Sequence, residues 1–139
     1  MRALVLLLLF IAPFPVSGGL VTSYSAIGKM DDKHYEFKVS EEDILRTPIW
    51  KPDVDFPPLS ARKAQEIARR EMQALLGSGK EQWILRETTI ADMRDGAHFV
   101  YVSQFEPPLG EACIGCEFIR MLVLMDGTIP KPIVKPLSS

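Results

Sequence analysis

Apolar and polar residues change their spacing partway along the chain, and the change predicts a helix followed by strands. Between Ala61 and Leu76, apolar residues recur every three or four positions and share one helical face: 61, 64, 68, 72, 75 and 76. Ser60 is a residue type that caps helix N-termini, and Gly77 is a type that closes helix C-termini. The spacing therefore predicts one main helix over 61–76, and its alanine-rich first turns favour close packing on a sheet.

Three segments after this helix have the composition of strands: 83–90, 98–105 and 118–125. The third segment is apolar on both faces apart from Arg120, which is typical of a central strand covered on both sides. Because one helix covers one face of a sheet, we expect the aromatic-rich N-terminal half to cover the other face. The Asp126-Gly127 pair predicts a tight turn that folds the chain back on the last strand.

The N-terminal half predicts smaller elements. Segments 20–27 and 33–39 fit a hairpin, because the second alternates apolar and charged residues. Ser40 followed by three acidic residues is typical of a helix start, and Pro48 ends that helix within about two turns. Segment 47–59 carries four prolines and predicts an extended strap.

These elements indicate an α+β fold, in which one main helix packs on an antiparallel sheet of three or more strands. The predicted organisation is a signal peptide over 1–18, a hairpin, short helix and proline-rich strap over 19–59, an α-β-β-β domain over 60–129, and an extended tail over 130–139. A length of 139 residues fits one domain of this kind.

The first 19 residues have the three parts of a secretory signal peptide. Met1-Arg2 is followed by a short apolar run and then by small residues, with cleavage expected after Gly18 or after Gly19. No cysteine lies near this site, which argues against lipid anchoring, and no later segment is long enough to span a bilayer. We therefore expect a secreted or periplasmic protein without stable membrane insertion after cleavage.

Net charge indicates no nucleic-acid partner. Removal of residues 1–18 takes away one arginine and no acid, so the net charge moves from −2 to −3. A chain with this charge has no basic field to attract nucleic acid or anionic lipid.

Cys113 and Cys116 are the two cysteines of the chain. They are the first and last residues of a four-residue segment that has glycine at position 115. In an exported protein this spacing fits a disulfide across a turn, since glycine there allows the positive φ of a type II turn. The alternative is a redox dithiol, but such sites lie at a helix N-terminus. Here acidic residues flank the pair and a strand follows, so we favour the structural disulfide.

Other chemistry has little support. His34 and His98 are distant in sequence from the cysteines, so a four-ligand zinc site is not expected, and no other metal or cofactor is predicted. The sequence contains no nucleophile elbow and no phosphate-binding glycine loop. We therefore expect a protein that is not an enzyme.

The order of elements resembles the PepSY domain over about residues 58–129. The residues that carry the resemblance are the alanine-rich helix start at 59–64, Trp83-Ile-Leu85, Phe99-Val-Tyr101-Val-Ser, and Val123-Leu-Met-Asp126-Gly127-Thr-Ile129. PepSY domains occur in propeptides of thermolysin-type secreted metallopeptidases and in small exported bacterial proteins. The resemblance implies an inhibitory or partner-binding α+β domain, and it brings no catalytic residues.

Together these features favour a small exported binding module that modulates or inhibits an extracytoplasmic enzyme or sensor, as a monomer or weak dimer. The candidate contact residues are Trp50, Phe56, Tyr101 and Arg120. Two alternatives stay open: a thiol–disulfide protein that uses Cys113 and Cys116, and a structural envelope-associated protein.

Overall fold

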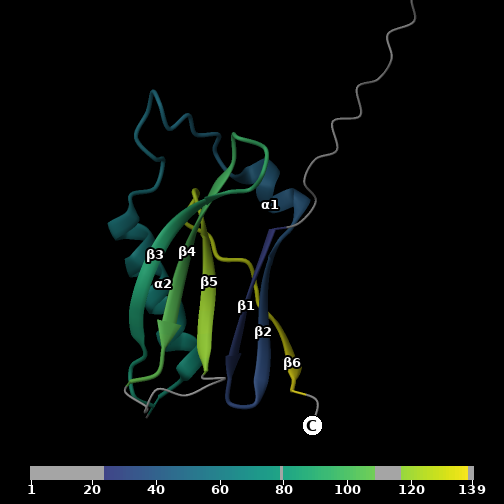
Figure 1. Ribbon diagram of the computed structural model, residues 1–139, viewed down its shortest axis with the longest axis vertical. Helices are drawn as coiled ribbons and strands as arrows, with labels where there is room; N and C mark the ends of the chain where they lie inside the picture. The colour runs from purple at the N-terminus through teal and green to yellow at the C-terminus, as the bar shows by residue number, and fades with distance from the viewer. Residues whose placement is uncertain (1–23, 79, 109–116, 138–139) are drawn as a thin grey trace, which may run out of the picture.

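The protein is an α+β fold in which a long helix packs against a six-stranded antiparallel sheet (Figure 1). The computed structural model describes residues 24–78, 80–108 and 117–137. No helix within these ranges is long and apolar enough to cross a bilayer. The elements are β1 (Tyr24–Met30), β2 (Lys33–Val39), α1 (Glu41–Arg46), α2 (Ala61–Leu76), β3 (Ile84–Asp92), β4 (Phe99–Glu106), β5 (Phe118–Leu124) and β6 (Ile133–Pro136).

Helix α2 confirms the prediction for residues 61–76. The Ser60 side chain accepts a hydrogen bond from the Lys63 backbone N–H at 3.2 Å, which satisfies one of the unpaired amides of the first turn. The helix buries one residue per turn on the face that packs against the sheet: Ala64, Ala68, Met72 and Leu76. The small side chains of the first half let the helix axis approach the sheet closely, whereas the larger ones fill the space at its C-terminal end.

The strand order is β3-β4-β5-β1-β2-β6, so the first strand in sequence lies in the middle of the sheet. Strands β3, β4 and β5 follow one another as antiparallel neighbours, as predicted. The chain then passes β1 and β2 before β6 pairs antiparallel with β2 (Figure 1). The sequence predicted an extended tail over 130–139, and residues 133–136 of this segment form β6, which completes the sheet.

The β1–β2 hairpin confirms the prediction of a hairpin but has a tighter turn than expected. Asp31 and Asp32 both take positive φ angles, 51° and 56°, so two residues connect the strands. Asparagine and aspartate tolerate this conformation better than most residues, and a turn of two such residues matches the twist of the flanking strands. The strand therefore extends to Met30 instead of ending at residue 27.

A short contact joins this hairpin to the rest of the sheet. Strand β1 pairs with β5 at Gly28 opposite Ile119 and at Lys29 opposite Phe118. A Cβ atom at Gly28 would lie 2.7 Å from Ile119 Cδ1 and 2.8 Å from the Phe118 carbonyl oxygen. Glycine at this position is therefore what allows the two strands to approach.

The sequence suggested that the N-terminal half covers the second face of the sheet, and among the described residues this face is covered only in part. Val100 and Leu122 are fully buried on it, whereas Gln104 is partly exposed.

The N-terminal hairpin extends the sheet sideways, and the strap lies on the α2 side at one end. The Trp50 and Phe99 rings meet edge to face at 4.9 Å, and the Tyr101 hydroxyl donates to the Leu59 carbonyl at 2.7 Å. A hairpin with free backbone groups gains more by joining the sheet than by lying across it, since pairing satisfies those groups.

Helix α1 connects the strap to the turn after β5. Ser40 and Asp43 form a reciprocal capping box at its N-terminus. At its C-terminus, Arg46 Nε donates to Asp126 Oδ2 at 3.1 Å. Burial raises the pKa of the Asp126 carboxyl, but hydrogen bonds from Thr128 and the ion pair with Arg46 outweigh burial and hold it below its usual range.

We expect Gly28→Ala to destabilise the protein by about 2 kcal/mol, because the added methyl group forces β1 away from β5. Denaturant unfolding monitored by circular dichroism measures this loss. Ser25→Ala, on an exposed position of the same strand, serves as the control and should leave the midpoint nearly unchanged. Equal midpoints for the two variants would contradict the close approach at Gly28.

We expect Asp126→Asn to cost about 1 kcal/mol of unfolding free energy at neutral pH, because the charge-assisted hydrogen bonds are lost. The folded-state pKa lies below the unfolded value, so the stabilisation is present above that value and is lost as the pH falls through the folded pKa. Urea unfolding at a series of pH values should therefore show the wild type and the variant converging in acid. Asp53→Asn, in the exposed strap, should show no such difference at any pH.

Candidate functional site

The two faces of the β3–β5 region differ in what covers them. Tyr101 and Phe105 of β4 point toward α2 and are buried, whereas Val102 and Gln104 point the other way and are partly exposed. On this second face, Val100, Leu122 and Leu124 are fully buried, although they lie on the same side as Val102 and Gln104. The face looks toward the viewer in Figure 1. The part of this face around Val102, Gln104 and Arg120 is therefore accessible, and we call it the open face of the sheet.

The open face contains a groove of about 480 Å³. It forms where residues 24–27 of β1, which have no partner on β5, lie apart from that strand. Strands β1 and β3 both line the groove although β4 and β5 lie between them in the sheet, so the open face is concave. The lining residues are Tyr24, Ser25, Ala26, Ile27, Glu87, Thr89, Ala91, Val102 and Arg120.

The lining combines apolar and charged side chains. Ile27, Ala91 and Val102 are apolar, and Ile27 is 47% exposed. Glu87 of β3 and Arg120 of β5 supply one charge of each sign. Ligand sites commonly have volumes of about 300–1,000 Å³ and mix apolar walls with a few polar groups. The groove has both properties, and its open shape suits a segment that lies along the surface.

A row of polar side chains crosses the open face and ends at Arg120 in the groove. Arg86 Nε donates to Glu106 Oε2 at 2.8 Å, and Gln104 Nε2 donates to Glu106 Oε1 at 3.0 Å. Arg120 Nε in turn donates to Gln104 Oε1 at 2.9 Å, and its guanidinium carbon lies 5.4 Å from the centre of the Phe118 ring. The row therefore connects β3, β4 and β5 and orients the Arg120 side chain.

The electrostatics of this row favour a fixed Arg120. The hydrogen bond from Arg86 is the main cause that holds the pKa of Glu106 below its usual range, with a further contribution from Gln104. Glu106 is therefore an anion at neutral pH and keeps the Gln104 amide oriented with its oxygen toward Arg120. Among the described residues, Gln104 is the one hydrogen-bond partner of Arg120, which leaves guanidinium N–H groups for an acceptor in the groove.

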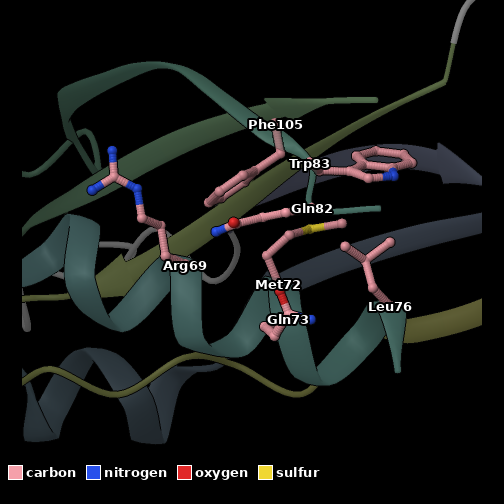
Figure 2. A pocket seen from close by; sticks show the side chains of 7 residues that line it. All are labelled: Arg69, Met72, Gln73, Leu76, Gln82, Trp83 and Phe105. Atoms are coloured by element: carbon pink, nitrogen blue, oxygen red, sulfur yellow. The ribbon is translucent and has the colours of Figure 1, made fainter. Parts of the chain in front are cut away.

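The seam between α2 and the sheet is packed and offers no second site. Figure 2 shows the Met72 and Leu76 side chains of α2 directed toward Trp83 and Phe105 of the sheet. The space between them holds no volume for even a water molecule. These side chains therefore belong to the hydrophobic core.

The four contact residues predicted from the sequence do not form one surface. Tyr101 is 1% exposed beneath the strap, Trp50 is half-buried against Phe99, and Phe56 is 95% exposed in the strap. Arg120 alone of the four lies in the groove, on the opposite face. Tyr101 and Trp50 pack in or against the core because their large apolar area drives burial, whereas Phe56 stays exposed.

The predicted disulfide between Cys113 and Cys116 lies outside the described residues and stays a prediction. His98 Nδ1 lies 2.5 Å from Asp95 Oδ2 in the turn between β3 and β4, and His34 is on β2. Within the described ranges, no three histidine, cysteine, aspartate or glutamate side chains come together as metal ligands. Neither histidine lines the groove.

Sequence reasoning missed most of the groove. Alternation along β4 places Val102 on the face opposite Tyr101, which is the one signal that the sequence carried for this surface. Glu87 and Thr89 of β3 also alternate with inward residues, but nothing local shows that β1 lies across from them. That juxtaposition depends on the pairing of β1 with β5, about 90 residues apart.

Comparison with known proteins gives no relative for this chain. No family model, no curated protein and no solved structure matches it.

Proposed function

We propose that the protein is a small exported binding module, without catalytic activity, that holds an extended segment of a partner protein in the groove of its open face. The observation that carries this proposal is the position of Arg120, which the hydrogen bond to Gln104 and the Phe118 ring fix at the groove. A guanidinium group fixed in this way is suited to a carboxylate, because its planar fork pairs with two oxygen atoms.

The apolar part of the groove supports a polypeptide as the occupant. Val102 and Ala91 provide apolar surface beside Arg120, and the hydroxyl groups of Ser25 and Thr89 provide hydrogen bonds along the walls. An extended peptide presents apolar side chains and backbone polar groups alternately, so it can use both kinds of surface. The resemblance to PepSY domains supports a peptidase or a sensor outside the cytoplasm as the partner.

Peptides selected by the protein should contain an acidic residue next to apolar ones. A random peptide library displayed on phage serves as the probe, with binding of selected peptides measured by fluorescence anisotropy. We expect Arg120→Glu to weaken binding by about tenfold or more, since it replaces an attraction by a repulsion. Arg70→Glu makes the same substitution at an exposed position of α2, on the other side of the sheet, and should have little effect.

Two outcomes would contradict the proposed function. One is that the wild-type protein selects no peptide at all. The other is that the selected peptides bind Arg120→Glu and Arg70→Glu equally well, which would place their site elsewhere on the surface.

The proposed export predicts a mature chain that begins at Gly19 or Leu20, because the small residues before these positions fit signal peptidase. Expression of the full chain in a bacterium, followed by N-terminal sequencing of the protein in the periplasm or medium, tests this expectation. Phe10→Arg interrupts the apolar run and should retain the protein in the cytoplasm with Met1 or Arg2 at its N-terminus. Recovery of the intact wild-type chain from the cytoplasm would contradict export.

A further inference from the structure

The structure points to a second interaction surface, the free edge of β3. We infer that this edge pairs antiparallel with the same edge of a second copy of the chain, which makes a symmetric dimer with one continuous sheet. β3 has nine residues and forms one border of the sheet, on the left in Figure 1. No described residue pairs with its outer side.

The two borders of the sheet differ in how they are protected against pairing. β6 has four residues, ends at Pro136, and carries Lys135. Proline and lysine on edge strands prevent pairing with another chain, and short edge strands do so too. β3 contains neither proline nor lysine, and its irregularity and the charged Arg86 and Glu87 lie in its first half. Its second half is rich in the β-branched residues that favour strands: Thr88, Thr89 and Ile90. β3 is therefore the border that is open to another strand.

The register of β3 shows which backbone groups face outward. The Met93 N–H donates to the His98 carbonyl at 2.9 Å, so this pair is of the hydrogen-bonded type. Such pairs alternate along an antiparallel ladder, and the register continues without interruption from Asp92 opposite Phe99 to Glu87 opposite Gln104. Residues 87, 89 and 91 therefore bond to β4, whereas residues 88, 90 and 92 direct their N–H and C=O groups to the free edge.

These outward groups are self-complementary around Ile90. In an antiparallel pair centred there, Ile90 faces Ile90 of the second copy, and Thr88 faces Asp92 at both ends. Each of these pairs is of the hydrogen-bonded type in both chains. Within residues 88–92, no two like charges face each other. A register centred on Thr88 would instead run into the irregularity between Leu85 and Glu87.

The exposure of the Ile90 side chain also supports a pairing centred at this residue. Ile90 is 42% exposed although it lies on the face that α2 covers elsewhere, so the helix leaves this position uncovered. Pairing of two copies removes this apolar surface from water. The contact area of two short edges is small, which corresponds to a weak and reversible dimer.

The dimer would also bring two grooves together. A two-fold axis perpendicular to the sheet keeps both open faces on the same side. Thr89 and Ala91, which line the groove, are the immediate neighbours of Ile90. The two grooves would therefore lie on either side of the axis and could hold two segments of one partner, which raises the apparent affinity by effective concentration.

Amide hydrogen exchange, measured by NMR at low and high protein concentration, tests the pairing directly. At low concentration the amides of Glu87, Thr89 and Ala91 should be protected and those of Thr88 and Ile90 should exchange quickly. At high concentration Thr88 and Ile90 should gain protection of about tenfold or more. Unchanged exchange at these two positions while the protein dimerises would overturn the inference, and so would a wild-type protein that is monomeric at every concentration.

Two matched variants test the edge by sedimentation velocity. Ile90→Lys places two like charges face to face at the centre of the dimer, and we expect the dimer dissociation constant to rise by about tenfold or more. Val134→Lys makes the same change on β6, at an aliphatic residue that is 47% exposed, and should leave the constant unchanged. Equal effects of the two variants would overturn the inference.

The experiments distinguish this inference from the proposed function. Arg120→Glu should weaken peptide binding and leave dimerisation intact, whereas Ile90→Lys should weaken dimerisation and leave the binding of a single peptide intact. Protection of Thr88 and Ile90 that appears only when a selected peptide is added would assign the edge to the peptide and overturn the dimer.

Discussion

The fold depends on a short backbone contact between β1 and β5. Two residue pairs connect the N-terminal hairpin to the β3–β5 half of the sheet, and at one of them the space for a side chain is already occupied by Ile119 and the Phe118 carbonyl. Glycine is the residue without a Cβ atom, so its presence at position 28 lets the strands meet. Without this contact the chain would contain two separate three-stranded sheets instead of one continuous sheet.

The same contact shapes the open face. Because β1 pairs with β5 at Gly28 and Lys29, its first residues are free to lie across the concave side of the sheet, opposite β3. The groove is thus a consequence of incomplete pairing in the middle of the sheet. The polar row from Arg86 to Arg120 crosses the neighbouring strands and gives one rim of this groove a fixed charge. In the proposed function, the partner segment therefore binds where β1 and β5 are not paired.

Buried hydrogen bonds and charged pairs around the sheet show how the irregular segments are held. The strap is fixed on the α2 side by the Trp50 ring and by the Leu59 carbonyl, which accepts from Tyr101. Burial raises the pKa of the Tyr101 hydroxyl, so the group stays protonated and acts as a donor. At the same end of the sheet, the Asp126 carboxylate connects the turn after β5 to α1. These contacts place the strap on the helix side and leave the other face for the groove.

Local features of the sequence determined the elements of this protein. The spacing of apolar residues with Ser60 and Gly77 defined α2, and alternation with turn residues defined β2, β4 and β5 to within about a residue. These signals act between near neighbours along the chain, so they can be read without knowing the fold. The place of β1 between β5 and β2, the pairing of β6 and the groove were decided by tertiary structure. Their physical cause is pairing between backbones that are far apart in sequence, and backbone groups are the same in every residue. The side chains therefore did not predict which strands would pair. Gly28 is the exception, but its role could be recognised only from the structure, where Ile119 occupies the space that a side chain at position 28 would need.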